Sequence, residues 1–369
     1  MTDPRQLRIV HTEASLGWGG QEIRILSEAA GMAARGHQVR LLCPAEARIF
    51  SEAGARGVAV TALPISRKNP RGVFALRRWL AANPCDVINT HSSTDSWLAA
   101  LACASLAGAP PLVRTRHISA PIPDNAATRW LYTRATARIV TTGERLRETL
   151  VHQNGFDGAR IVSIPPGVDT TRFAPGDRDA ARAALGLPPG PLVGIVATLR
   201  SWKGHRFLVE AFHSLARPEA RLAIVGDGPQ REALEAQVAG LGLGDRVTFA
   251  GNRADVAPWL QAFDVFALPS YANEGVPQAI VQAMLCALPV VTTAVGSIGE
   301  AVQDGMTGLM VAPQQAAPLA AALARLLDDP ALREQLGAAA RAAALERFSL
   351  ESMLDRMEAV FIDAVATHG

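Results

Sequence analysis

The stretch DVFALPSYANEGVPQAIVQAMLCALP, from Asp264 to Pro289, contains three kinds of segment in succession. An apolar run comes first, a loop rich in turn-forming residues follows, and a second apolar run ends the stretch. Pro277 is expected at the first helical position, because proline there lacks only a donor that the helix would leave unpaired. The stretch therefore predicts a buried strand, a loop and a packed helix, which together are typical of an α/β fold.

Glu274 is expected just outside the N-terminus of this helix. Several backbone N–H groups and the positive end of the helix dipole point outward there and favour an anion. Gln278 and Gln282 follow four and eight residues later, which places their amides one turn apart on one face. The loop predicts a site for a ligand that carries both phosphate and hydroxyl groups.

The same alternation of strand and helix runs through the chain in two series. Strands are expected at 7–11, 38–43, 58–63, 86–90, 111–116 and 137–142, and again at 192–199, 221–227, 246–251, 264–270, 289–293 and 308–313. Helical segments such as 21–34 lie between them, and this rhythm indicates parallel sheets. The segment IPPGVDTTRFAPGD, residues 164–177, has no periodicity and the composition of a linker. We therefore expect two domains, 1–170 and 171–349, with a C-terminal helix at 350–367 that packs back on the first.

Length and composition fit this division. A chain of 369 residues suits two domains of ordinary size, and its 49% apolar content is ample for two cores. No window approaches the ~18 uninterrupted apolar residues of a membrane span, and the first apolar run is too short for a signal peptide. A cytoplasmic protein is expected. The cysteines, Cys43, Cys85, Cys103 and Cys286, lack paired spacing and are expected to be reduced core residues.

Charge is divided unequally along the chain. Residues 1–174 carry 21 Lys and Arg against 13 Asp and Glu, and residues 175–369 carry 15 against 21. Much of the basic excess lies in residues 66–80, a predicted helix with an aromatic edge that contains Arg67, Lys68, Arg71, Arg77 and Arg78. Such a helix could lie on an anionic membrane, at ~1 kcal/mol per basic residue, or could be a solvated face. Nucleic-acid binding is not expected, because no recognised motif accompanies the charge.

Candidate ligand-binding residues follow the predicted strands, where open parallel sheets bind ligands. In EASLGWGGQE, Gly19 and Gly20 precede a helix and could approach a phosphate or simply form a turn. The spacing is not G-x-G-x-x-G, which argues against a nicotinamide enzyme. His91 and His117 end the fourth and fifth strands, and each could be structural or face a ligand. One of Arg114 and Arg116 is expected to face the ligand.

The second series has its own ligand loops. Arg200 and Lys203 flank a glycine turn in ATLRSWKGHRFL, a combination typical of phosphate binding. Gly226 and the Asn252-Arg253 pair could complete the rim or form ordinary turns. The only D-x-D sequence, residues 177–179, lies in the linker region, so no metal is expected.

Together these stretches resemble the retaining nucleotide-sugar glycosyltransferases of family 4. The resemblance rests on GWGGQE, IPPGVDTTRFAPGD, WKGHRFLVEAF, LAIVGDGPQREALE, DVFALPSYANEGVPQAIVQAM and EAVQDGMTGLMVAP, and it is densest from 164 to 313. It implies the GT-B fold, in which two Rossmann-like parallel-sheet domains face an interdomain cleft. The first domain would be the acceptor side, and the second would bind the nucleotide-sugar donor.

The resemblance also implies roles for single residues. Glu274 matches the first of two signature glutamates, and the second falls on Gln282, a departure that would keep but weaken the ribose contact. Thr198 stands where the family has an arginine, and Arg200 is implied as its substitute. Pro166 stands where the linker often has asparagine. The implied catalytic residues are His91, Arg200, Lys203 and Glu274; the implied donor-binding residues are Gly19, Gly20, Gly226, Asn252, Arg253, Gly275, Val276, Pro277 and Gln282; His117 and Arg116 are implied on the acceptor or sugar side.

The expected reaction moves a sugar from a nucleotide-diphosphate sugar to an acceptor hydroxyl with retained anomeric configuration. Neither a cofactor nor a metal is expected, and the leaving phosphate would take the acceptor proton. The acceptor would be a glycan or a lipid-linked sugar in bacterial envelope polysaccharide or lipopolysaccharide assembly, with the enzyme peripheral on the inner face of the cytoplasmic membrane. The alternatives are a GT-B nucleotide-sugar epimerase, which needs no acceptor, and a noncatalytic sugar-nucleotide-binding protein, which the Gln282 departure makes plausible.

Overall fold

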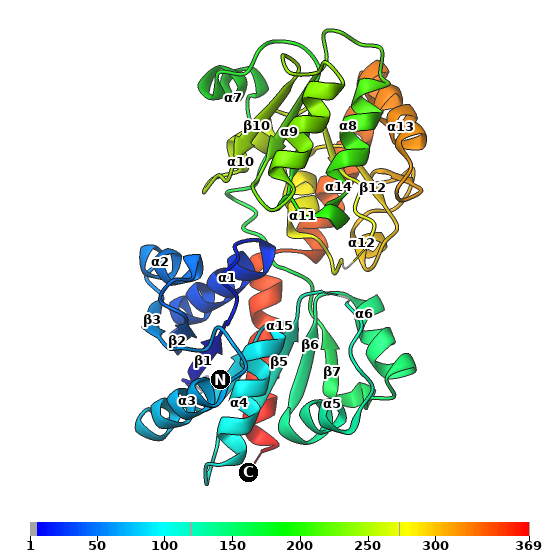
Figure 1. Ribbon diagram of the computed structural model, residues 1–369. Helices are drawn as coiled ribbons and strands as arrows, with labels where there is room; N and C mark the ends of the chain where they lie inside the picture. Colours follow the sequence, from blue (N-terminus) through cyan, green and yellow to red (C-terminus); the bar gives the residue numbers. More distant parts are fainter. Residues whose placement is uncertain (1–5, 119, 273, 369) are drawn as a thin grey trace. The chain divides into compact units, whose positions relative to one another are not determined.

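The computed structural model describes residues 6–118, 120–272 and 274–368, so Ser119 and Asn273 of the loops above lie outside the described residues. The chain divides into two compact units (Figure 1). Unit 1 comprises the chain up to Pro165 together with the segment from Glu351 onward, and unit 2 comprises Pro166–Leu350. Among the described residues, no helix is long and apolar enough to cross a membrane.

Unit 1 is built on a parallel sheet of seven strands in the order β3-β2-β1-β4-β5-β6-β7. Its strands are β1 (Arg8–Thr12), β2 (Gln38–Cys43), β3 (Ala59–Ala62), β4 (Val87–Thr90), β5 (Leu112–Arg116), β6 (Arg138–Thr141) and β7 (Ile161–Ser163). Its longer helices are α1 (Gly20–Ala34), α2 (Arg48–Ala55), α3 (Pro70–Ala82), α4 (Ser93–Ala104) and α15 (Leu350–Ala366). The six predicted strands of this series are confirmed within one or two residues. The seventh, β7, was not predicted, because its three residues run directly into the proline-rich linker.

Unit 2 repeats the plan with six parallel strands in the order β10-β9-β8-β11-β12-β13. These are β8 (Leu192–Val196), β9 (Arg221–Val225), β10 (Val247–Gly251), β11 (Val265–Leu268), β12 (Val290–Thr293) and β13 (Leu309–Val311). Helices α8 (His205–His213), α9 (Arg231–Gly240), α11 (Gln278–Leu285), α13 (Ala316–Asp328) and α14 (Pro330–Arg347) are among those that cover them. All four residues of β11 and of β12 are buried, as expected for strands covered on both faces.

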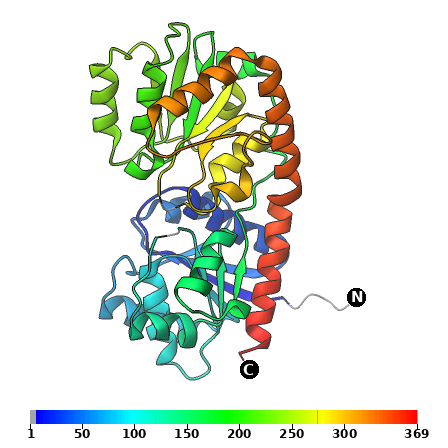
Figure 2. The same cartoon turned by 90° about the vertical axis from the view of Figure 1, so that its right-hand side faces the viewer.

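Helix α15 completes unit 1, although the chain reaches it last (Figure 2). Leu354 packs so closely on α1 that a Cβ atom at Gly31 would lie 2.4 Å from one of its methyl carbons. Phe361 meets the ring of His11 edge-on, with the centroids 6.3 Å apart. Arg35 binds Glu351, Asp355 and Glu358 of α15, which fixes this helix along α1. The C-terminal helix therefore packs on the rest of unit 1.

Two helix starts differ from the prediction. Pro277 has extended backbone angles (φ −70°, ψ 125°) and caps α11 from outside, so the first helical residue is Gln278. Helix α3 begins at Pro70, because the side chain of Asn69 accepts a hydrogen bond from the N–H of Gly72 and caps it there. Arg67 and Lys68 therefore precede the helix and are not part of a continuous basic face.

Candidate active site

Three histidines form a hydrogen-bonded chain at the carboxyl edge of the sheet of unit 1. Nδ1 of His11 lies 3.0 Å from Nε2 of His91, and Nδ1 of His91 lies 3.0 Å from Nε2 of His117. Strand β4 lies between β1 and β5, so the ends of these three strands meet at one place. The structure thus brings His91 and His117 together as the sequence suggested. His11 was missed, because its position within a predicted strand gave no sign of its neighbours.

All three imidazoles are held neutral at physiological pH. Burial lowers the pKa of His11 to about 4. Burial, followed by the neighbouring charges of His117 and His11, lowers the pKa of His91 well below its usual value. Burial, followed by the charge of Arg24, does the same to the pKa of His117. The three histidines can therefore orient hydroxyl groups through hydrogen bonds but do not supply a positive charge.

Asp95 fixes the backbone that carries His91. Its carboxylate accepts hydrogen bonds from the N–H of His91 at 2.8 Å, the N–H of Ser92 at 2.7 Å and the hydroxyl of Thr12 at 2.6 Å. Ser92 and Asp95 form the capping box of α4, and burial raises the pKa of the Asp95 carboxyl. The S-x-x-D spacing was visible in the sequence and could have revealed this positioning residue.

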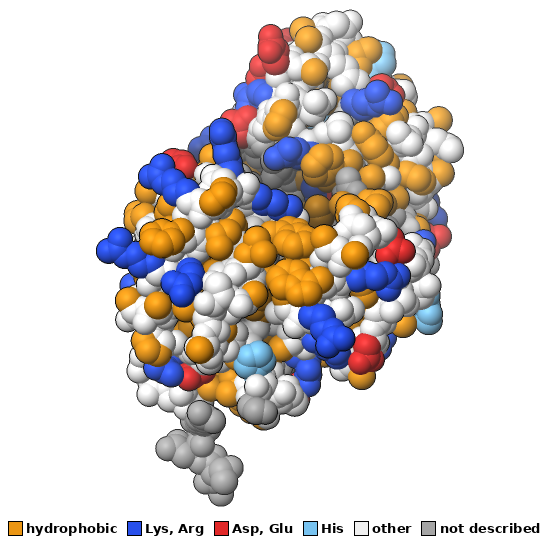
Figure 3. Space-filling model, turned by 60° about the horizontal axis from the view of Figure 1, so that its bottom comes forward, with side chains coloured by type: hydrophobic (Ala, Val, Ile, Leu, Met, Phe, Trp, Pro, Cys, Tyr) orange, Lys and Arg blue, Asp and Glu red, His pale blue; other side chains and the backbone are white. Residues whose placement is uncertain are grey.

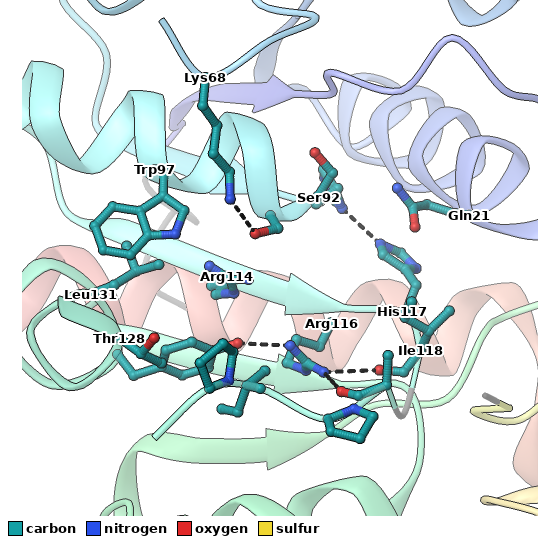
Figure 4. A pocket seen from close by; sticks show the side chains of 17 residues that line it. Gln21, Lys68, Ser92, Trp97, Arg114, Arg116, His117, Ile118, Thr128 and Leu131 are labelled. Atoms are coloured by element: carbon teal, nitrogen blue, oxygen red, sulfur yellow. Dashed lines mark hydrogen bonds between the residues drawn. The ribbon is translucent and has the colours of Figure 1, made fainter. Parts of the chain in front are cut away.

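A pocket of about 330 Å³ lies beside the histidine chain, entirely within unit 1 (Figure 4). Lys68 enters it from the bend before α3, and His117 and the arginines of β5 line it from the sheet. Trp97 of α4 and Leu131 supply apolar walls. The pocket therefore combines cations with an apolar surface at the edge where a parallel sheet binds ligands.

Arg114 and Arg116 both line this pocket, which corrects the expectation that only one of them faces the ligand. Residues two apart on a strand project from the same face, so the pair could not be divided between the two sides. Arg116 donates to the hydroxyl of Tyr132 at 2.8 Å and to the carbonyl of Ala120 at 2.7 Å. It therefore anchors the loop after β5, whereas the guanidinium of Arg114 stacks on the Tyr132 ring with its carbon 4.6 Å from the centroid.

The glycine-rich turn of unit 1 begins helix α1. Gly19 is its N-cap in an extended conformation, and Gly20 is its first residue. The next residue, Gln21, lines the pocket and donates a hydrogen bond to the buried carboxylate of Glu13. Neither glycine is among the lining residues, so the turn positions Gln21 at the pocket.

In unit 2, the predicted lysine and glutamate are in direct contact. Nζ of Lys203, after β8, lies 2.7 Å from Oε1 of Glu274, after β11, and the hydroxyl of Ser270 donates to the same oxygen at 2.7 Å. The two strands are neighbours in the sheet, which brings together residues 71 positions apart. An ammonium group and a carboxylate therefore lie at the ligand-binding edge of the second sheet.

Glycines let the loops of unit 2 approach one another closely. Gly204 follows Lys203 with φ +78°, and a Cβ atom there would lie 2.0 Å from the carbonyl oxygen of Pro269. Gly296 has φ +60°, and a Cβ atom there would lie 2.0 Å from the carbonyl oxygen of Glu274. These contacts fix the backbone on either side of the Lys203 and Glu274 pair.

The other residues predicted to bind the donor in unit 2 lie in different settings. Gly226 has φ +138°, and a Cβ atom there would lie 2.0 Å from the carbonyl oxygen of Ala197. Arg200 is exposed and lies over the ring of Trp202, and Asn252 and Arg253 are exposed after β10. Gly275, Val276 and Pro277 are buried before α11. Gln282 is buried on α11.

His205 is a further residue that the sequence analysis missed. It begins α8 directly after Gly204, and both of its ring nitrogens are buried without a partner among the described residues. Burial, followed by the charge of Lys203, lowers its pKa to about 3. The described residues contain no group of three His, Cys, Asp or Glu side chains placed to hold a metal ion, and the four cysteines are unpaired.

Comparison with known proteins identifies a matching family for each unit. The family described as Glycosyltransferase Family 4 matches residues 18–172, and the one described as Glycosyl transferases group 1 matches residues 190–329. The 2-deoxystreptamine glucosyltransferase of Streptomyces kanamyceticus is 31% identical over 351 residues, which are 84% of this chain and 90% of that protein.

Two further relatives agree. The D-inositol 3-phosphate glycosyltransferase of Nocardia farcinica is 36% identical over 245 residues, 59% of this chain and 54% of that protein, so the match spans about half of that relative. The crystal structure of Anabaena Alr3699/HepE in complex with UDP and glucose superposes with a TM-score of 0.87 at 23% identity and covers 97% of this chain and 100% of that one. The chain therefore belongs to the family 4 glycosyltransferases, and its two parallel-sheet units are those of the GT-B fold.

Proposed function

We propose that this protein transfers a sugar from a nucleotide-diphosphate sugar to an acceptor hydroxyl with retention of the anomeric configuration. The observation that carries the proposal is the pairing of Lys203 with Glu274 at the carboxyl edge of the second sheet. An ammonium group suits the diphosphate of a donor, and a carboxylate suits the hydroxyls of its sugar. The solved neighbour that contains UDP and glucose has the same fold, which is consistent with this choice of donor.

On the donor side, Lys203, Arg200 and the N-terminus of α11 would neutralise the charge that develops as the diphosphate leaves. Each such preorganised donor is worth about 3 kcal/mol in the transition state. Lys203 is held by Glu274 in the described structure, so an arriving diphosphate would take over the ammonium group. Glu274 would then be free to accept hydrogen bonds from the sugar, and Gln282 would contact the ribose without a charge.

On the acceptor side, unit 1 offers neutral hydrogen-bonding groups. His91 is buried and His117 half-buried, and the lowered pKa of each makes the neutral ring a weak base. They would therefore orient sugar and acceptor hydroxyls through hydrogen bonds. The leaving phosphate would accept the proton of the acceptor hydroxyl. We assign no protein general base, no metal and no cofactor to the reaction.

The acceptor we propose is a glycan or a lipid-linked sugar of the bacterial envelope, reached from the cytoplasmic face of the membrane. The surface in Figure 3 carries hydrophobic side chains among lysines and arginines. On α3, Phe74 is 65% exposed, and Arg71 and Arg78 on the same helix are exposed. Arg77 donates a hydrogen bond to Ser105, and Lys68 donates one to Ser93 at the pocket. The proposed membrane contact therefore uses fewer basic residues than the sequence suggested.

The test of the donor site is Lys203→Ala. We expect transfer to fall at least about tenfold, because a charge-assisted contact to the diphosphate is lost. Arg206→Ala is the matched control, since Arg206 is an exposed cation three residues away on α8. Thermal denaturation establishes that both variants are folded. An unchanged rate in Lys203→Ala would remove this residue from the mechanism.

Two measurements separate the alternatives. Incubation with donor alone, followed by analysis of the sugar, would show an isomerised donor if the protein were an epimerase. Slow hydrolysis of the donor without an acceptor would exclude a purely binding protein. The relatives are named as glycosyltransferases, which favours transfer over both alternatives.

A further inference from the structure

The pocket of unit 1 has an unbalanced charge. Lys68, Arg114 and Arg116 line it, and its described lining contains no aspartate or glutamate. The nearby carboxylate of Asp95 is occupied by the hydroxyl of Thr12 and by backbone N–H groups. Three cations therefore share one small pocket without a carboxylate in its described wall.

Arg114 carries a buried hydrogen-bond donor that lacks a partner among the described residues. Its side chain is 5% exposed, and its Nη1 has no hydrogen-bond partner among the described residues. Burial lowers its pKa, but a guanidinium remains charged in proteins. A buried charge is costly unless it is paired and hydrogen-bonded, and the face of Tyr132 offsets only part of that cost. Figure 4 shows Arg114 between Lys68 and Arg116, where a ligand would meet it.

Lys68 is the second available cation of the pocket. Its Nζ donates to the hydroxyl of Ser93, at the N-terminus of the 12-residue helix α4, at a distance of 3.0 Å. Burial, and then the charge of Arg114, lower the pKa of Lys68, which reflects the proximity of two cations that face each other across the pocket. The two Nη atoms of Arg116 donate to Tyr132 and to two backbone carbonyls, and its buried Nε has no partner among the described residues. Lys68 and Arg114 are therefore both available to one anion.

We propose that this pocket binds an anionic group, a phosphate or a carboxylate, that is part of the acceptor. This inference rests on the proposed function, since it assigns the chemistry of the acceptor to the pocket beside His91 and His117. A volume of about 330 Å³ holds a ligand of the size of one sugar or cyclitol ring with its anionic substituent. The anion would pair with Arg114 and Lys68, and the ring would pack on Trp97. A neutral acceptor without a suitable oxygen would leave the Nη1 donor of Arg114 buried and unsatisfied, so the pocket would select against it.

Inorganic phosphate is the first probe, measured by isothermal titration calorimetry on the full chain. The wild-type protein and Lys203→Ala should both bind phosphate at the unit 1 pocket. Lys68→Ala and Arg114→Met should weaken that binding at least about tenfold, because each loses a charge-assisted contact. Arg78→Ala, an exposed cation of α3 outside the pocket, should leave it unchanged. Arg114 is buried, so Arg114→Met can fail to fold. The phosphate affinity of Lys68→Ala, a substitution at an exposed position, therefore decides whether the proposal holds.

Two arms identify the source of the anion. One arm measures binding of a soluble hexose phosphate, and the other measures binding to vesicles that contain phosphatidylinositol. The ligand that carries the right anion should bind the wild-type protein and Arg78→Ala but not Lys68→Ala. Phosphate binding that is the same in Lys68→Ala as in the wild type, or that disappears in Lys203→Ala alone, would overturn the inference. Failure of the donor assignment would appear separately, as full transfer activity in Lys203→Ala.

Discussion

Gly296 offers a test of how far the backbone of Glu274 can move before function is lost. In Gly296→Ala, the new Cβ atom would lie 2.0 Å from the carbonyl oxygen of Glu274, whereas real Cβ atoms essentially never come closer than 3.0 Å. The Glu274 backbone must therefore retreat by about 1 Å, and a displacement of that size at a reacting group costs about 100-fold in rate. The substitution also places alanine at φ +60°, which costs about 1 to 2 kcal/mol.

Gly242→Ala separates these two effects. Gly242 lies in the same unit at φ +66°, but a Cβ atom there would meet nothing within 4 Å. Both variants should therefore lose a few degrees of Tm from backbone strain, and only Gly296→Ala should lose transfer activity about 100-fold. The assays are thermal denaturation and turnover of the nucleotide-sugar. Equal activity in the two variants would refute the view that this backbone contact holds Glu274 in place.

Three other substitutions test single contacts. Gln282→Glu restores the charge that the family carries at this position, so donor affinity should rise; an unchanged Kd measured by calorimetry would place the ribose elsewhere. Burial lowers the pKa of His11 from 6.5 to about 4. Between these two pH values the unfolded state binds more protons than the folded state, so the free energy of unfolding falls as the pH falls from 6.5 to 4. The loss amounts to up to about 3 kcal/mol. His11→Asn keeps a polar group near His91 without this titration, and denaturant unfolding between pH 6.5 and 4 should show a shallower loss than in the wild type. In Arg24→Met, the buried carboxylate of Glu28 loses its cation, whose Nε lies 3.9 Å from the Glu28 Oε2 atom. The free energy of unfolding at pH 8, measured in urea, should fall by about 3 to 5 kcal/mol. A fall of less than about 1 kcal/mol would show that the pair does not stabilise the fold.

The sequence predicted the strands because each is a short apolar run with turn residues beyond it, and strand ends are where His91, His117 and Lys203 were expected. What it could not show is which strands are neighbours. His11 joins the histidine chain only because β1 lies beside β4 in the sheet. The pairing of Lys203 with Glu274 likewise depends on β8 and β11 being adjacent, and only the family resemblance suggested that the two act together.

The arginines of β5 show a second limit of the sequence. Both were visible, and their spacing places them on one face, but their separate tasks depend on local partners that no pattern encodes. Arg116 donates to Tyr132 and to the carbonyl of Ala120, whereas the guanidinium of Arg114 lies over the Tyr132 ring and its Nη1 has no partner among the described residues.

The return of helix α15 to unit 1 has a consequence for synthesis of the chain. The ribosome completes Pro165 and must then add the 185 residues of unit 2, 166 to 350, before α15 emerges. At about 5 to 20 residues per second, this takes roughly 10 to 40 s. During that interval the surface that receives Leu354, Met357 and Phe361 is bare, whereas unit 2 is already contiguous and can fold. The segment made first is therefore the part of this enzyme that finishes folding last, and it is the part most exposed to aggregation or to chaperone capture.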